Sequence, residues 1–169
     1  MTTREMPRSV AVERIGQGYG AHIVAEDGER AALARRFAIL AIDRLEAEVR
    51  LEPVPHTPLI RLDARLQAVV RQACVVTLAP VIQHIDESFS LLFGPAEGEV
   101  GGTIDIDPDD PDIPEPFEEG RIDVGEALAQ QLSLCLDPYP RAPGASFFPA
   151  EETESSSTPF AALTKLKRP

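Results

Sequence analysis

The sequence is poor in cysteine and has no long hydrophobic run, and these absences exclude two large classes of protein. Cys74 and Cys135 are the only 2 cysteines among 169 residues, too few for the disulfide framework of a small secreted protein. The longest apolar run, about Phe37 to Ile42, falls far short of the roughly 20 residues of a membrane-spanning helix. The N-terminus also lacks the apolar core of a secretory signal. We therefore expect a cytoplasmic protein with reduced thiols and no membrane partner.

Positive charge is almost absent from one segment. Residues 97–126 hold 12 acidic side chains against Arg121 alone, whereas residues 1–95 hold 12 acids and 11 arginines and residues 127–169 hold 4 of each sign. A total of 5 prolines lie between residues 94 and 120. Like charges repel one another, and few apolar side chains are available there to anchor the chain. We therefore predict a mobile acidic loop over residues 94–120, with poor order over 97–118.

Sequence motifs for catalysis are also missing. The 3 histidines are scattered, and no H-E-x-x-H, C-x-x-C or G-x-S-x-G is present. Gly16, Gly18 and Ala21 match G-x-G-x-x-A, but residues 22–24 are strand-like where a dinucleotide site needs a helix, so we predict a hairpin turn. We expect no catalytic residue, cofactor or metal. A small-molecule-binding protein or an enzyme of unknown reaction is the alternative.

Hydrophobic periodicity is what the sequence does contain. Apolar and polar residues alternate with a period of two in several segments, which is typical of strands with one buried face. In the first long one, Ile39 and Ala41 share a side with Leu45, and Asp43 is the one break in the apolar row. The predicted strands cover residues 8–15, 20–25, 39–51, 60–78 and 81–93. The last three most simply form an antiparallel meander with one buried face and one exposed face.

Two amphipathic segments are predicted to cover the buried face of this sheet. The first covers about residues 27–37 and the second residues 123–136, with Asp123 as its N-cap. In the second, Val124, Leu128 and Leu132 recur every four residues and should pack on the 39–93 sheet. The predicted fold class is therefore α+β, an antiparallel β-sheet meander covered by two helices.

The chain is predicted to divide near its C-terminal end. Residues 1–149 are long enough for a single α+β domain, and residues 150–158 form a polar linker. Residues 159–169 form a short basic amphipathic motif that is marginal as an isolated helix, so we expect order only when its apolar side chains enter a groove on a partner. The candidate partner-binding residues of this motif are Phe160, Leu163, Leu166, Lys165, Lys167 and Arg168.

Three segments resemble the YceD family of bacterial and plastid proteins. They are RQACVVTLAPVIQHIDESFSLLF at 71–93, GRIDVGEALAQQLSLCLDPYPR at 120–141, and PFAALTKLK at 159–167. The proline-rich DPYPRAPGA stretch is similar to the alphaproteobacterial branch. Many members carry C-x-R-C where this chain has Cys74 and Thr77. Because one thiolate cannot make a tetrahedral zinc site, we predict no zinc.

The resemblance implies a non-enzymatic role in large ribosomal subunit biogenesis and rRNA accumulation, and two mechanisms fit. In the first, the protein binds ribosomal RNA or a pre-ribosomal large subunit through arginines of the exposed sheet face and the basic tail. In the second, the acidic segment binds a basic ribosomal protein. A single positive patch would favour RNA, and dispersal of the arginines among carboxylates would favour a protein. The arginines concerned are Arg44, Arg50, Arg61, Arg65 and Arg71.

Overall fold

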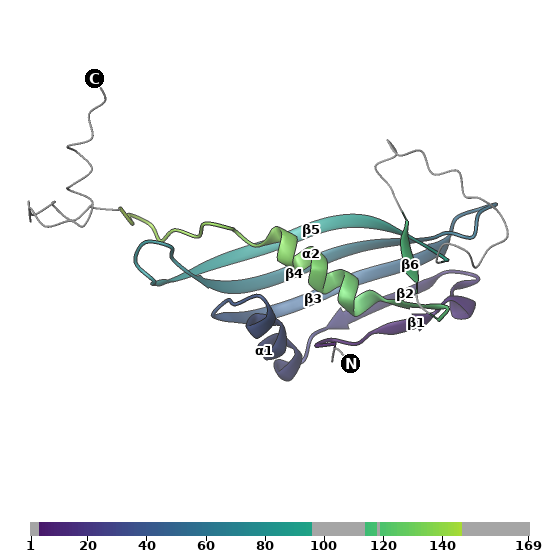
Figure 1. Ribbon diagram of the computed structural model, residues 1–169, viewed down its shortest axis with the longest axis horizontal. Helices are drawn as coiled ribbons and strands as arrows, with labels where there is room; N and C mark the ends of the chain where they lie inside the picture. The colour runs from purple at the N-terminus through teal and green to yellow at the C-terminus, as the bar shows by residue number, and fades with distance from the viewer. Residues whose placement is uncertain (1–3, 96–113, 118, 147–169) are drawn as a thin grey trace, which may run out of the picture.

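The computed structural model describes residues 4–95, 114–117 and 119–146, and it confirms the α+β class (Figure 1). Its elements in chain order are β1 (Ser9–Ala11), the 3-10 helix η1 (Val12–Ile15), β2 (Tyr19–Val24), α1 (Asp27–Arg36), β3 (Ala41–Pro53), β4 (Ile60–Ala73), β5 (Pro80–Pro95), β6 (Glu115–Phe117), β7 (Arg121–Asp123) and α2 (Val124–Cys135). The division predicted at residue 149 lies outside the described residues.

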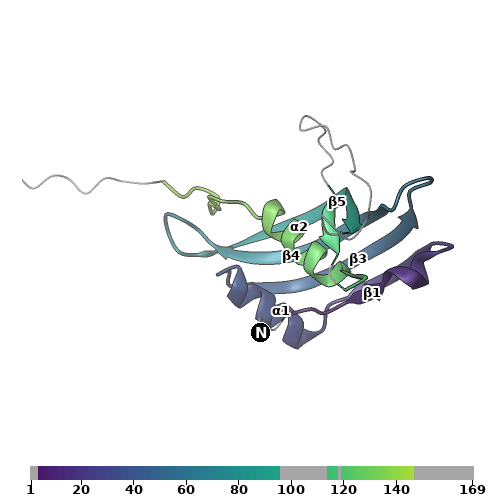
Figure 2. The same cartoon turned by 45° about the vertical axis from the view of Figure 1, so that its right-hand side comes forward.

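One five-stranded sheet forms the centre of the described fold. Its strand order is β2-β3-β4-β5-β6, with β2 to β5 antiparallel and β6 parallel to β5. A two-stranded sheet pairs β1 with β7. Helix α2 lies across the large sheet in both views, and α1 packs beside β3 (Figures 1 and 2). The meander of β3, β4 and β5 is the one predicted from their alternating residues.

The long strand β4 shows why these residues form a half-buried sheet. Its side chains alternate in burial along the whole strand, because successive residues point to opposite faces. Leu62, Leu66 and Val70 are completely buried and face the helices. Each such aliphatic side chain contributes about 1.5–3 kcal/mol by leaving water. The opposite residues carry the charged groups, so the pattern fixes which face is exposed.

Helix α2 begins and packs as predicted. The Asp123 carboxylate accepts a hydrogen bond from the backbone N–H of Glu126 at 3.2 Å, which caps the helix. Val124, Leu128 and Leu132 are at most 1% exposed and belong to the same core as the sheet residues. At the other end, the Gln83 amide donates to the carbonyl of Cys135 at 2.8 Å. Within the described residues, no helix is long and apolar enough to cross a membrane.

A β-bulge at Asp43 shifts the phase of β3, which the sequence pattern did not predict. Ile42 pairs with Val70, and the next pair joins Arg44 to Val69, so Asp43 is an extra residue in the strand. Ile42 is therefore buried together with Leu45, while Ala41 is only half-buried. The prediction that Ala41 shares the buried row with Leu45 was wrong for this reason.

The N-terminal prediction was wrong in its strand pairing, although β1 and β2 overlap the two predicted strands. Residues 8–15 do not form a hairpin with residues 20–25, because β1 pairs with β7 and β2 pairs with β3. Residues 12–15 instead form a helical turn that places Ile15, which has no exposed surface, in the core. The turn closes where the N–H of Gly18 donates to the Ile15 carbonyl at 2.7 Å, and Gly18 has the positive φ of 96° that glycine adopts without strain.

Two further boundaries differ from the sequence prediction. Strand β4 ends at Ala73 rather than at residue 78, because Cys74 starts a turn closed by the hydrogen bond from its N–H to the Ala79 carbonyl at 2.8 Å. Leu78 is consequently 77% exposed. At the predicted loop 94–120, β5 extends to Pro95 and residues 115–117 form β6. The mobility predicted for this loop remains a prediction, since residues 96–113 and 118 lie outside the described residues.

Candidate partner-binding surfaces

The face of the sheet turned away from the helices carries the five arginines singled out from the sequence, and we call it the arginine face. Arg44 and Arg50 lie on β3, and Arg61, Arg65 and Arg71 lie on β4. Strand register places carboxylates in the same rows. Glu48 lies opposite Arg65, and Arg50 lies opposite Asp63.

Each arginine of this face is paired with a carboxylate. Two of the pairs cross between strands. Arg65 donates two hydrogen bonds to Asp86 at 2.8 and 2.7 Å, and Arg71 donates two to a single oxygen of Asp43 at 3.1 and 2.8 Å. The other three pairs lie within a strand: Arg44 with Glu46, Arg50 with Glu52 at 2.8 Å, and Arg61 with Asp63 at 3.6 Å.

The electrostatics of the arginine face follow from this pairing. The Arg65 guanidinium lowers the pKa of Asp86 to about 2, so that carboxylate stays ionised at any physiological pH. Glu48 adds one more carboxylate on the same side of β3. The arginines are therefore dispersed among acids, and they do not form a positive patch.

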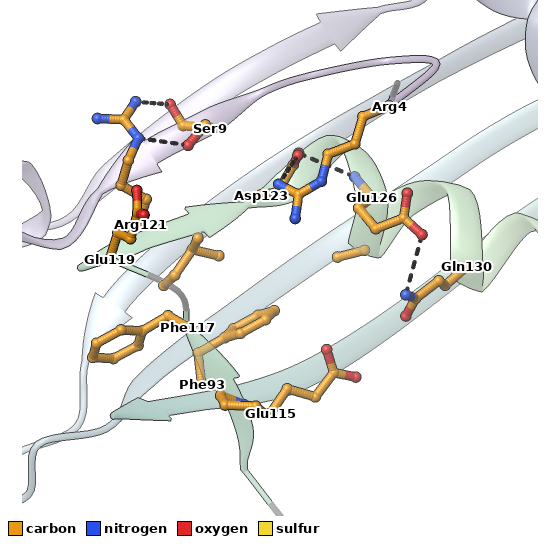
Figure 3. Close-up of a pocket in the computed structure, with 13 residues that line it drawn as sticks. Arg4, Ser9, Phe93, Glu115, Phe117, Glu119, Arg121, Asp123, Glu126 and Gln130 are labelled. Carbon is orange, nitrogen blue, oxygen red and sulfur yellow. Dashed lines mark hydrogen bonds and ion pairs between the residues drawn. The ribbon is translucent and has the colours of Figure 1, made fainter. Parts of the chain in front are cut away.

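A groove at the β6 edge of the sheet forms a second surface, and we call it the edge groove. It encloses about 510 Å³ between β5 and β6 on one side and β7 with the first turns of α2 on the other. Figure 3 shows Phe93 and Phe117 between Glu115 and the residues of β7. Across the space lie Glu126 and Gln130 of α2. Sequence reasoning did not find this groove, because its walls combine Arg4 and Ser9, Phe93, and the stretch from β6 to α2, which are far apart in the chain.

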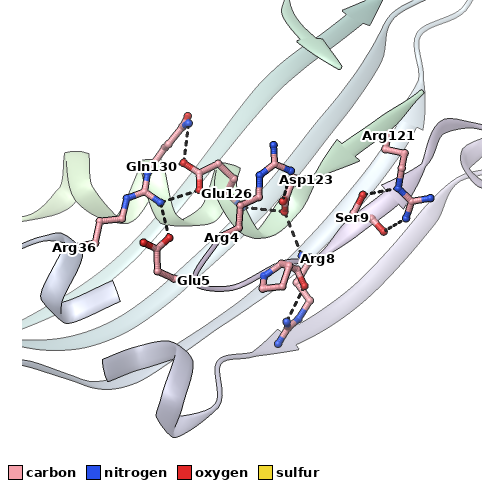
Figure 4. Close-up of polar contacts among 10 residues, drawn as sticks. Arg4, Glu5, Arg8, Ser9, Arg36, Arg121, Asp123, Glu126 and Gln130 are labelled. Carbon is pink, nitrogen blue, oxygen red and sulfur yellow. Dashed lines mark hydrogen bonds and ion pairs between the residues drawn. The ribbon is translucent and has the colours of Figure 1, made fainter. Parts of the chain in front are cut away.

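The charged groups of the edge groove are not equally available. Arg4 pairs with Asp123 at 2.7 Å, and Arg36 binds Glu126 with two hydrogen bonds of 2.8 and 2.6 Å (Figure 4). Arg36 therefore lowers the pKa of the Glu126 carboxyl. Within the described part of the chain, no hydrogen bond or ion pair engages the carboxylates of Glu115 and Glu119. The groove thus combines aromatic rings with two unneutralised acids.

Arg121 is bound to Ser9 and not to a carboxylate of the groove. Its guanidinium donates to the Ser9 hydroxyl at 2.8 Å and to the Ser9 carbonyl at 3.2 Å, so the arginine is held against β1 (Figure 4). It therefore fastens the two-stranded sheet, and among the described residues no carboxylate pairs with it.

Cys74 lies in a ring of backbone donors at the β4–β5 turn. Its sulfur accepts from the N–H groups of Ala142 at 3.3 Å, Thr77 at 3.4 Å and Val76 at 3.4 Å. The N–H of Ala142 first, then the Thr77 side chain and the other backbone donors, lower the thiol pKa to about 6 against the opposing effect of burial. No group of three metal-binding side chains exists among the described residues. The cysteine therefore ties residue 142 to the hairpin.

This arrangement predicts a pH-dependent contribution to stability. The folded-state pKa of Cys74 lies below the ordinary value of 9.0. Its thiolate therefore stabilises the fold fully above about pH 9, and this stabilisation is lost as the pH falls toward 6. We expect the stability lost in Cys74→Ala to grow between pH 6 and 9 in chemical denaturation. Cys135→Ala is the control, because burial raises the pKa of that thiol. If the difference in stability between Cys74→Ala and the unmodified protein does not change with pH, the lowered pKa assigned to Cys74 is wrong.

The C-terminal candidate residues are not placed by the structure. Phe160, Leu163, Leu166, Lys165, Lys167 and Arg168 all lie outside the described residues.

Comparison with known proteins identifies one family. The model of the family described as "Large ribosomal RNA subunit accumulation protein YceD" matches residues 62–167, well over half of the chain. The match spans β4, β5, β6, β7 and α2, and so includes both sides of the edge groove. No match was found among curated proteins or among solved structures.

Proposed function

Because the chain belongs to the YceD family, we propose that it supports accumulation of the large ribosomal RNA subunit by binding a basic protein of that subunit. In this proposal the protein acts without catalysis, and its contact with ribosomal RNA is indirect. The partner is a lysine- and arginine-rich protein of the pre-ribosomal large subunit. The placement in the alphaproteobacterial branch stays a proposal that depends on residues 137–145 alone.

The observation that carries the choice of partner is the pairing of all five arginines on the arginine face. A phosphate contact releases counterions from RNA only when the arginine is free to take their place. Here an RNA strand would have to displace a carboxylate from each guanidinium and would then lie against those same acids. Carboxylates repel phosphate and attract lysine and arginine. The described surface therefore supports a basic protein as partner better than RNA.

The direct experiment is affinity purification of the tagged, full-length chain from its own cells, followed by a high-salt wash. We expect a basic ribosomal protein to stay bound after the washed complex is treated with ribonuclease. Retention of rRNA without any ribosomal protein would favour the alternative mechanism, in which arginines and the basic tail contact RNA.

A charge prediction tests the arginine face separately. We expect the triple variant Arg61→Gln, Arg65→Gln, Arg71→Gln to leave the salt dependence of rRNA association unchanged. If these arginines neutralised phosphates, the slope of log K against log salt would become shallower by about 0.7–0.9 for each arginine replaced. The matched variant Asp43→Asn, Asp63→Asn, Asp86→Asn removes the paired acids, and it should gain nonspecific RNA affinity. The measurement is a salt titration of binding to an rRNA fragment.

The tail motif is a second contact that we propose for the same partner complex. Deletion of residues 159–169 should leave the melting temperature of the domain unchanged and abolish association with pre-ribosomal particles. The reason is that three apolar side chains at spacing of three, next to basic residues, suit a groove on another molecule. A fall of several degrees in melting temperature would instead make the motif part of the fold. Thermal unfolding and particle co-sedimentation are the two measurements.

A small-molecule function has one observation in its favour. The edge groove has the volume of a ligand site, since such sites span about 300–1,000 Å³. Ligand sites, however, are lined mainly by apolar side chains, whereas this groove holds four carboxylates and two arginines. This composition suits a charged polymer better than a small metabolite.

A further inference from the structure

The edge groove joins two features: carboxylates that form no ion pair with a described residue, and aromatic rings beside them. Glu115 lies on β6 opposite Phe93 of β5. From the other side, Gln130 donates a hydrogen bond to Glu126 at 3.2 Å, and both side chains face the same space as Glu115 (Figure 3). Two walls from separate elements thus present oxygen atoms across one cavity.

The charge of the cavity is negative even after its internal pairs are counted. Asp123 is engaged by Arg4 and by the start of α2, and Glu126 is engaged by Arg36. Glu115 and Glu119 remain, and Arg121, which also lines the groove but is held by neutral Ser9, offsets only one of these two charges. A cation that entered here would meet oxygen acceptors at Glu115 and aromatic faces at Phe93 and Phe117. An ammonium or guanidinium beside such a ring is attracted electrostatically by the ring quadrupole.

Strand addition is a poor alternative for this edge. Strand β6 has only three residues and contains Pro116, which has no backbone N–H to offer a further strand. The groove therefore recognises side chains rather than a hydrogen-bonded backbone.

We propose that the edge groove binds a lysine or arginine side chain from an extended basic segment of a protein partner, with Glu115 as its principal charge contact. This inference depends on the function proposed above, since it locates the contact for a basic protein. The charge of the groove selects a cation, and its volume of about 510 Å³ accommodates a long side chain together with part of the adjoining backbone. Glu119 at the rim attracts the next basic residue of the same segment.

The test uses the full-length chain and a synthetic peptide of about twelve residues that alternates lysine with alanine. Binding is measured by calorimetry near physiological salt, where screening over about 8 Å suppresses long-range attraction. The matched probe carries acetyl-lysine at every lysine position. We expect Glu115→Gln to weaken binding of the lysine peptide about five-fold, the equivalent of one partly exposed ion pair of about 1 kcal/mol.

The control variant is Glu87→Gln, which removes the same charge from an exposed position on β5. Six residues separate it from Phe93, which is about 20 Å along a strand. We expect Glu87→Gln to change the affinity by less than about two-fold. A second readout follows the NMR signals of the Phe93 and Phe117 rings, which should shift when the lysine peptide is added and stay in place with the acetylated probe.

Two outcomes would overturn the inference, and they differ from failure of the proposed function. If the peptide binds but Glu115→Gln and Glu87→Gln weaken it equally, the contact lies elsewhere on the protein. If the ring signals do not move at saturation, the groove stays empty. If neither peptide binds and only an rRNA fragment does, the proposal of a basic protein partner fails as well.

Discussion

Leu128→Asp is expected to cost the domain several kcal/mol of its free energy of unfolding. Leu128 is 1% exposed and lies at the centre of the stripe that α2 turns toward the sheet. Aspartate at this position would place a carboxylate among aliphatic side chains, with no cationic partner among the core residues that the structure describes. A buried unpaired charge costs about 3–5 kcal/mol, a large share of the stability of a domain of this size. Thermal unfolding monitored by circular dichroism measures the effect.

Leu134→Asp is the matched control for this variant. Leu134 lies on the same helix and is 78% exposed, so the same chemical change there meets water. We expect its melting temperature to stay within a few degrees of the unmodified protein, as is usual for exposed positions. If both variants unfold at the same temperature, α2 does not pack as described.

Gly125→Ala should have the second-largest effect, although it adds a single methyl group. A Cβ at this position would lie 1.8 Å from the Met6 carbonyl oxygen and 3.1 Å from the Arg8 nitrogen. The obstruction is backbone, which cannot rotate away as a flexible side chain could. The N-terminal segment would have to lift off α2, and we expect a loss of about 3 kcal/mol. Denaturant unfolding gives the value.

Gly28→Ala provides a close control, because Gly28 is the second residue of α1 just as Gly125 is the second residue of α2. No atom lies within 4 Å of a Cβ built at Gly28. Alanine is a better helix former than glycine, so this variant should gain about 0.5–1 kcal/mol. Opposite signs of the two changes in stability would distinguish the effect of close backbone contact from the effect of helix propensity. A stabilising Gly125→Ala would show that residue 6 does not cross the helix here.

The strands and helices that depend on local pattern were predictable from the sequence. The alternation in β4 and the cap and stripe of α2 each follow from residues close together in the chain, and the structure has both. The prediction failed where a distant partner decides the conformation. Ser9–Ala11 is extended because β7 pairs with it, and nothing near it in the sequence indicates that partner. The bulge at Asp43 was not predicted for a related reason, since one polar residue in an apolar row is also compatible with an uninterrupted strand.

The candidate site was likewise predictable only in part. The arginines of β3 and β4 were correctly placed on the exposed face by their alternation. The two pairs that cross between strands, Arg65 with Asp86 and Arg71 with Asp43, were not predictable, because they depend on strand register. The acidity around residue 115 was visible in the composition. The aromatic rings beside it become part of one groove only when β6 pairs with β5.

The pairing of β1 with β7 has a consequence for the order of events during folding. Ser9 and Arg121 lie 112 residues apart in the chain, and their hydrogen bonds close the two-stranded sheet. Closing so long a loop is slow compared with forming the β3–β4–β5 meander, whose strands follow one another directly. On the translating ribosome, Met6 and Val10 therefore stay in water until α2 has emerged from the exit tunnel. The N-terminal segment is synthesised first but folds last, and during that interval its apolar residues are available to chaperones and to other nascent chains.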